Sequence, residues 1–187
     1  MIRFLLVLFL LGNIPNLSAQ SDSVDFENLD IPFLENLVKE RIDSIRNVYG
    51  LSTLNVDDIL YKAALDHAVY LKNRRMIGHE QASEEKRNAF KRAKYYGAQN
   101  VKVVGENVAF DRVARVENYN KHTRETEYEY HYTYARLADD IVEAWLQSET
   151  HFANLKTPDY KFTGVAIVYD KRHKDFMCVQ VFADYYD

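Results

Sequence analysis

Residues 164–183, GVAIVYDKRHKDFMCVQVFA, decide the class of the fold. Two runs rich in β-branched and aromatic side chains, 164–170 and 176–183, flank the charged connection 171–175. Apolar runs of this length around a short polar connection are typical of two antiparallel strands joined as a hairpin. The sequence therefore predicts a β-hairpin in this region.

Upstream of the hairpin, apolar residues recur at the spacing of helices. Side chains three and four residues apart share one helix face, so such a run predicts an amphipathic helix. The segments with this spacing are 32–49, 55–75 and 135–147. The charged segment 83–96 suits a shorter helix that Gly97 closes. Helices followed by a hairpin predict the α+β fold class.

The composition is that of a folded domain. The chain has 187 residues, of which 47% are apolar, with 24 Lys+Arg against 28 Asp+Glu and a formal net charge of −4. This apolar fraction is too high for a disordered chain, and the length suits a single hydrophobic core. A negative net charge attracts neither phosphate nor anionic lipid, so we expect no nucleic-acid partner and no polybasic membrane contact.

Residues 1–19 have the pattern of a secretory signal peptide, because a basic residue precedes the apolar run 4–11 and small residues follow it. The apolar run is far below the ~20 residues that a membrane-spanning helix needs. We expect removal of 1–19, a flexible lead at 20–31 and one domain over 32–187, secreted or periplasmic, with no transmembrane segment after cleavage. An uncleaved anchor or a buried N-terminal strand is the alternative.

Three polar residues are expected to have structural roles. Cys178 is the single cysteine, so the chain forms no internal disulfide, and its place in a strand-like run predicts a buried, inert thiol. His67 lies on a predicted helix and is interpreted as a packing residue. Asn107 is expected to hold a loop through its side-chain amide.

The segment 112–134 is an insertion of charged residues and tyrosines. Every second residue of 127–134 is a tyrosine. A period of two suits a solvent-facing strand or an extended loop, and a segment without fixed structure is equally compatible with it. The role of this insertion stays open.

No familiar catalytic signature is present in the sequence. His79-Glu80 begins like the zinc-protease motif, but Ser83 stands where that motif needs its second histidine. The sequence has no Gly-x-Ser-x-Gly elbow, no phosphate-binding glycine loop and no paired-cysteine zinc site. It therefore offers no candidate nucleophile.

Three other polar residues stand where structure alone does not require them: His79, Glu106 and His151. A carboxylate inside an apolar run costs several kcal/mol unless a partner meets it, and imidazole is a natural partner. Two histidines with one or two carboxylates are also a ligand set for transition metals. The spacing alone does not bring the three together. Histidines bonded to helix-terminal carbonyls and a carboxylate bonded to backbone amides remain the alternatives.

Three blocks resemble the CAP superfamily, which includes cysteine-rich secretory proteins and plant pathogenesis-related proteins and is also called the SCP domain. The blocks are 65–80, 105–109 (GENVA) and 145–155 (WLQSETHFANL), and the resemblance spans about 34–184. It implies a three-layer α-β-α sandwich with an antiparallel sheet. The lack of disulfides resembles the bacterial branch.

The resemblance also implies a surface cleft in which two histidines and two acidic residues bind a divalent metal such as zinc in some members. His79 and His151 match the two histidines and are the implied metal ligands, and Glu106 matches one acid. The position of the second acid corresponds to Ser148, so Glu149, one place later, is the candidate for the fourth cleft residue.

These observations support three hypotheses of function. The first is a secreted, non-catalytic CAP module that binds a ligand or partner through the His/Glu cleft, with a divalent metal as a candidate cofactor. The second is a metal-assisted hydrolase of peptides or cell-envelope material, with Glu106 as general base. The third is a lipid or sterol carrier. The partner class stays open between a small molecule, a lipid and an extracellular or envelope component.

Overall fold

A computed structural model describes residues 24–112, 116–129 and 133–186, except for the side chains within 116–120 and 125–129. The predicted signal peptide lies outside the described residues. In chain order, the described elements are α1 (Ile31–Val48), β1 (Asn55–Val56), α2 (Asp58–Arg74), the short 3-10 helix η2 (Glu84–Lys86), α3 (Ala89–Tyr96), β2 (Val101–Arg112), β3 (Val116–Asn120), β4 (Glu125–Glu129), α4 (Tyr134–Leu146), α5 (Glu149–Leu155), β5 (Phe162–Asp170) and β6 (Asp175–Tyr185).

The main sheet has four strands in the order β1-β5-β6-β2. β5 and β6 pair antiparallel from Phe162↔Ala183 to Asp170↔Asp175, which confirms the predicted hairpin. β2 pairs antiparallel with β6, and β1 adds a short parallel contact to β5. β2 therefore forms one edge of the sheet.

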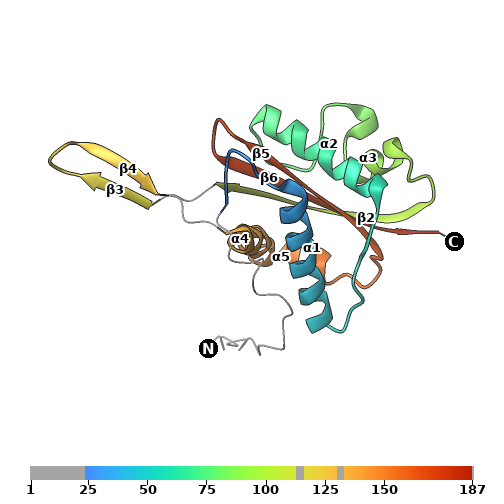
Figure 1. The fold of residues 1–187 in the computed structure, drawn as a ribbon. Helices are drawn as coiled ribbons and strands as arrows, with labels where there is room; N and C mark the ends of the chain where they lie inside the picture. Colours follow the sequence, from blue (N-terminus) through green and yellow to red (C-terminus); the bar gives the residue numbers. More distant parts are fainter. Residues whose placement is uncertain (1–23, 113–115, 130–132, 187) are drawn as a thin grey trace, which may run out of the picture.

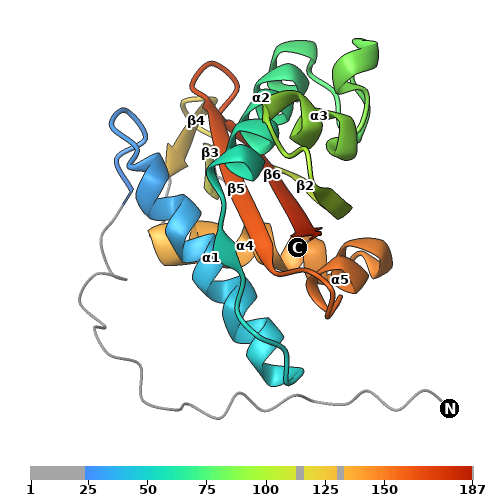
Figure 2. The ribbon, with the colours of Figure 1, turned by 90° about the vertical axis from the view of Figure 1, so that its right-hand side faces the viewer.

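Helices cover both faces of this sheet, as Figures 1 and 2 show. α2 and α3 lie on one face, where α2 packs on β5 and β6 and α3 packs on β2. α1 and α4 lie together on the opposite face, and α5 follows α4 along the edge strand β2. The predicted three-layer α-β-α sandwich of the α+β class is confirmed.

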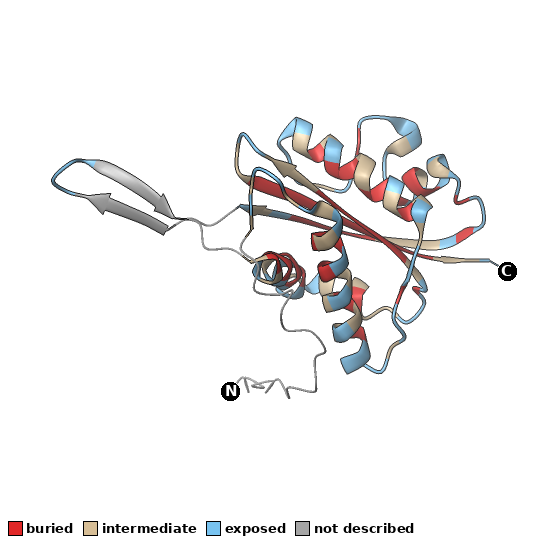
Figure 3. Ribbon diagram, in the orientation of Figure 1, coloured by how far each residue is buried: buried red, intermediate tan, exposed pale blue. Residues whose placement is uncertain are grey.

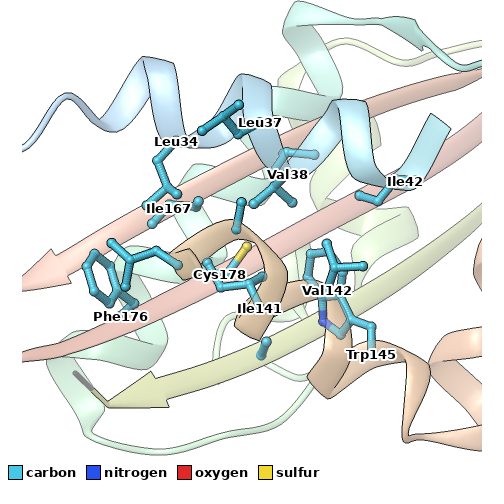
Figure 4. Packing of buried hydrophobic residues seen from close by; sticks show 14 of the residues in the cluster. Leu34, Leu37, Val38, Ile42, Ile141, Val142, Trp145, Ile167, Phe176 and Cys178 are labelled. Atoms are coloured by element: carbon cyan, nitrogen blue, oxygen red, sulfur yellow. The ribbon is translucent and has the colours of Figure 1, made fainter. Parts of the chain in front are cut away.

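Two apolar clusters fill the spaces between the three layers, and the buried residues follow the helix faces that meet the sheet (Figure 3). Figure 4 shows part of the cluster between the sheet and the helices α1 and α4, to which α1 contributes Leu34 and Val38 and α4 contributes Ile141 and Trp145. Cys178 is buried among them, and burial raises the pKa of its thiol well above the usual value. The prediction of a buried thiol is confirmed.

Side-chain caps mark where the helices begin. Asp30 Oδ1 accepts a hydrogen bond from the Phe33 N–H at 3.0 Å, and Asp57 Oδ1 accepts from the Leu60 N–H at 2.8 Å.

The segment 83–96, predicted as one short helix, is divided into two helices, η2 and α3. The reason is Asn88, whose side-chain oxygen accepts from the Lys91 N–H at 3.0 Å and starts a new helix.

Residues 24–30, which the sequence places in a flexible lead, lie against the domain. Val24, Phe26 and Leu29 pack on the cluster under α1 and α4. The backbone of this segment is also bonded to α4, because the Asp30 N–H donates to the Tyr134 hydroxyl at 2.7 Å. This half of the lead contributes apolar contacts to the domain.

The predicted insertion contains a second, two-stranded sheet. β3 and β4 pair antiparallel from Val116↔Glu129 to Asn120↔Glu125, and the hairpin projects away from the sandwich (Figure 1). The alternating segment 127–134 is a strand up to Glu129, and 130–132 lie outside the described residues. Among the described helices, none combines the length and apolar character that crossing a membrane requires.

Candidate functional site

The site is built on the Gly105-Glu106-Asn107 stretch of the edge strand β2. Successive residues of a strand face opposite sides, so Glu106 points toward α2 and α3 while Gly105 and Asn107 face α5. A Cβ at Gly105 would overlap the Tyr160 hydroxyl and lie 3.2 Å from Asn154 Oδ1. Only glycine therefore allows this close approach of the α5 layer.

Glu106 is the centre of a polar cluster, which we call the Glu106 cluster: His67, His79, Arg92, Glu106 and His151. The Glu106 side chain is 4% exposed, and its two oxygens have different partners. Oε2 pairs with Arg92 Nη2, and Oε1 accepts from His79 Nδ1 at 3.0 Å. Such pairing is what makes a buried carboxylate tolerable.

Arg92, on α3, is fully buried and was not predicted as a site residue. Its Nη1 donates to the carbonyl oxygens of Lys86 at 3.1 Å and His79 at 3.3 Å. One guanidinium thus holds the Glu106 carboxylate and the backbone that carries His79. The sequence feature that could have identified Arg92 is its position as a cationic residue beside Ala89 and Ala93, on the apolar side of a short helix.

His79 follows α2 and presents an oriented imidazole at the surface. Its side chain is 53% exposed. Because Nδ1–H donates to Glu106, Nε2 is the ring nitrogen that remains available to a ligand. The hydrogen bond to Glu106 is the main cause that raises the pKa of His79 above its usual value.

His151 lies in the first turn of α5, and its ring meets the ring of His79. The ring centroids are 5.9 Å apart with an interplanar angle of 62°. Burial, with a smaller contribution from the charge of His79, lowers the pKa of His151. The two histidines come from opposite layers of the sandwich and meet across the edge strand β2.

Asn107 joins α5 to this edge. Its Nδ2 donates to the His151 carbonyl oxygen at 3.2 Å, and its Oδ1 accepts from Asn154 Nδ2 at 2.9 Å. Asn154 Nδ2 also donates to the Glu106 carbonyl oxygen at 3.1 Å. Asn107 has a structural role through its amide, as expected, but the segment that it holds is the helix α5, which carries His151, and not a loop.

His67 is fully buried beneath Glu106 and does more than fill space. Its Nε2 donates to the Gly78 carbonyl oxygen at 3.0 Å, which leaves Nδ1 to accept from Gln81 Nε2 at 3.3 Å. Its Nε2 lies 3.7 Å from Glu106 Oε1. Burial lowers the pKa of His67, so the neutral ring positions the residue that precedes His79.

Glu149, the fourth implied cleft residue, does not join the cluster. It is the exposed first residue of α5, and no hydrogen bond or ion pair links its carboxylate to a side chain in the described part of the chain. Ser148, at the position of the family's second acid, caps α5 by accepting from the His151 N–H at 3.5 Å. The structure therefore brings together His79, Glu106 and His151 and leaves Glu149 apart.

The side chains of this site can hold a divalent metal only if some of its coordination positions are filled by other molecules. Both Glu106 oxygens are engaged, which leaves the imidazoles of His79 and His151 as ligands. Within the residues described, no group of three or more His, Cys, Asp or Glu side chains is arranged to hold a metal ion. Catalytic zinc sites supply three protein ligands, so this pair needs water or the bound molecule to complete the coordination. Glu106 fits the role of a carboxylate that orients a metal-binding histidine.

Comparison with known proteins bears on the family and the fold of the chain. The model of the cysteine-rich secretory protein family (CAP) matches residues 39–182, which is more than half of the chain. No match was found among curated protein sequences.

Solved structures with the same fold include three bacterial proteins. An outer surface protein of Borrelia burgdorferi has a TM-score of 0.62 at 19% identity, and the match covers 89% of this chain and 99% of that one. An extracellular protein of Bacillus anthracis that contains an SCP domain has a TM-score of 0.57 at 21% identity, covering 81% and 40%. A cysteine-rich secretory protein of Staphylococcus aureus has a TM-score of 0.54 at 13% identity, covering 82% and 39%. At these identities, the likeness concerns the fold alone.

Proposed function

Because the chain belongs to the cysteine-rich secretory protein (CAP) family, we propose that it is an extracytoplasmic binding module whose ligand is held by the imidazoles of His79 and His151. The proposed location is supported by the predicted signal peptide at 1–19. It is also supported by the relatives, whose names describe an outer surface, an extracellular and a secretory protein.

One observation carries the proposed binding role: an exposed imidazole is held in a fixed orientation by a buried carboxylate, next to a second imidazole. Arg92 and His67 fix the backbone on both sides of His79, through hydrogen bonds to the carbonyl oxygens of His79 and Gly78. Such support lowers the entropy that a ligand must overcome when it binds to the imidazole. The site is therefore preorganised for binding.

A divalent metal such as zinc is the ligand that we propose for these two nitrogens. His79 Nε2 and the ring of His151 would hold it, and when bound it would supply a positive centre for an oxygen of a further molecule. Glu106 would act through His79 and not on the metal, because its oxygens are already engaged. With two protein ligands, the site is expected to bind metal more weakly than a closed site with four.

The geometry supports binding better than hydrolysis. A general base must reach the proton that it removes, whereas Glu106 is almost fully buried with both oxygens paired. An activated nucleophile would be hydrogen-bonded to the imidazole ring of a histidine. Within the described residues, no serine hydroxyl and no cysteine thiol is hydrogen-bonded to the ring of His79 or His151.

Isothermal titration with Zn²⁺ tests the proposal. The wild type is expected to bind one ion, and the double variant His79→Ala/His151→Ala is expected to bind none. Glu106→Gln keeps both imidazoles but weakens the orientation of His79, so its affinity should fall by about 10–100-fold, as for other residues that orient metal ligands. His173→Ala is the matched control, since His173 pairs with Asp170 at 2.8 Å, away from the cluster. Equal uptake by all four proteins, or uptake by none, would contradict the proposal.

A further inference from the structure

A second cavity lies in the layer formed by α2 and α3, beside the segment 81–86 that leads from one helix toward the other (Figure 1). Its volume is about 490 Å³. Side chains of α2, of 81–86 and of Tyr95 on α3 line it. We call this cavity the α2–α3 pocket. None of the residues that line it belongs to the Glu106 cluster, so it is a separate site.

The walls of the α2–α3 pocket include exposed apolar surface. Tyr95 is 52% exposed and Val69 is 39% exposed. Tyr70 forms a further wall, and its hydroxyl accepts a hydrogen bond from the Ala82 N–H at 3.2 Å. Exposed apolar side chains around one hollow indicate a binding surface, and a tyrosine ring offers a flat apolar face with a polar edge.

The charges in the α2–α3 pocket balance. Asp66 and Lys86 pair with each other at 2.8 Å, so neither calls for a charged ligand. The side chains of Arg74, Glu85 and Ser83 also line the pocket, and within the described part of the chain they form no hydrogen bond and no ion pair. The polar groups that remain for a ligand are therefore a cation, an acid and a hydroxyl, with no net charge between them.

Hydrogen bonds hold the segment 81–86 in place before any ligand binds. The Gln81 N–H donates to the Arg87 carbonyl oxygen at 2.8 Å, and the buried Gln81 side chain donates to Asp66 Oδ2 at 2.9 Å. The Lys86 carbonyl oxygen accepts from Arg92 Nη1 at 3.1 Å. A pocket with preformed walls loses less entropy when it binds a ligand.

The lining limits the chemistry of the occupant. A hydrocarbon chain would cover Arg74 and Glu85 without giving either a hydrogen-bond partner, which costs free energy. An anion would meet a like charge at Glu85, and a cation would meet one at Arg74. A sugar ring has an apolar C–H face, and each of its hydroxyl groups both donates and accepts, so it can bond to an acid and to a guanidinium alike.

The volume also suits a short chain of sugar rings. Pockets for drug-sized ligands have volumes of about 300–1,000 Å³, and the α2–α3 pocket falls within this range. We propose that the α2–α3 pocket binds a neutral oligosaccharide, with a sugar ring against Tyr95 and Val69 and with hydroxyl groups bonded to Arg74, Glu85 and Ser83. This ligand does not depend on the metal proposed for His79 and His151, so it is expected to bind equally well in the presence of EDTA.

Titration with neutral trisaccharides, followed by ¹H–¹⁵N correlation spectra of the protein with EDTA present, tests this proposal. The probes are cellotriose, maltotriose and triacetylchitotriose. At least one of them is expected to give saturable shifts at the amides of 69–74, 81–86 and 95. The dipeptide alanyl-tyrosine, which carries a ring and both charges, represents the alternative occupant and is expected to bind at least tenfold more weakly than the tightest trisaccharide.

Three variants separate a lost contact from a damaged fold. Tyr95→Ala and Arg74→Ala should each weaken binding of that trisaccharide at least tenfold. Both residues are exposed, so both variants should keep the melting temperature of the wild type. Phe90→Ala is the matched control, because Phe90 is a 38% exposed aromatic residue on α3 with a lysine over its ring, outside the pocket, and it should change binding less than twofold.

Three outcomes would overturn the proposal. The first is that no trisaccharide gives saturable shifts at these amides. The second is that alanyl-tyrosine binds as tightly as the tightest trisaccharide. The third is that the Tyr95 and Arg74 variants bind like the Phe90 control.

Discussion

Replacing Arg92 with methionine removes the guanidinium that balances the buried carboxylate of Glu106. Arg92 is fully buried and the Glu106 side chain is 4% exposed, so water cannot take over the role of the lost partner. Breaking a buried pair from one side costs about 3–5 kcal/mol, because an unpaired charge is left behind. The variant also leaves the carbonyl oxygens of Lys86 and His79 without this donor. We therefore expect Arg92→Met to lower the free energy of unfolding by about 4 kcal/mol or more.

Urea unfolding followed by circular dichroism measures this loss, and a double-mutant cycle identifies its cause. In Arg92→Met/Glu106→Leu the unpaired charge is absent, so the double variant should be more stable than the sum of the single effects allows. Arg87→Met is the matched control, because its partner Glu84 is on the surface and such pairs contribute about 0–1 kcal/mol. A loss below about 1 kcal/mol for Arg92→Met, or strictly additive effects in the cycle, would refute this reasoning.

Three further predictions concern the fold. Burial raises the pKa of Glu35 from 4.5 to about 7, so the folded protein keeps a proton that the unfolded chain releases above pH 4.5. The free energy of unfolding should therefore fall by about 3 kcal/mol between pH 4.5 and 7, and Glu35→Gln should remove this fall in urea titrations at several pH values. Gly105→Ala introduces a Cβ that overlaps the Tyr160 hydroxyl, so it should lower the melting temperature, and Tyr160→Phe in the same chain should restore part of the loss. Ile141→Ala leaves a cavity under α4 and should cost about 2–5 kcal/mol in urea unfolding, whereas a loss below 1 kcal/mol would contradict the packing.

Local sequence patterns predict the elements of this fold whose residues interact with near neighbours. The β5–β6 hairpin and α1 are examples, because a short connection joins the strands and helix contacts repeat every three to four residues. β2 is not predicted, since Gly105, Glu106 and Asn107 interrupt its apolar run. In the folded molecule these three residues face α5, α3 and α5 in turn. Their identities are required by these contacts with distant segments, which a local sequence pattern does not contain.

The candidate site follows the same division between local and distant contacts. The sequence singles out His79, Glu106 and His151 as polar residues in unexpected places, and their convergence depends on the pairing of β2 with β6 and on the position of α5. Arg92 is missed because its partner Glu106 is 14 residues away and in another layer. Glu149 is included because it stands one place after Ser148, the position of the family's second acid, but in the structure it is an exposed residue at the start of α5.

The central claim is that the rings of His79 and His151 form one binding site that Glu106 orients. Long-range ¹H–¹⁵N spectra of the imidazole rings test it most directly, because each of the six histidines gives its own pair of ring nitrogens. In the wild type, His79 should be the Nδ1–H tautomer, and Zn²⁺ should shift the ring nitrogens of His79 and His151 together while the other four histidines stay unchanged. The opposite tautomer at His79, or a zinc response at one of the two rings without the other, would contradict the claim.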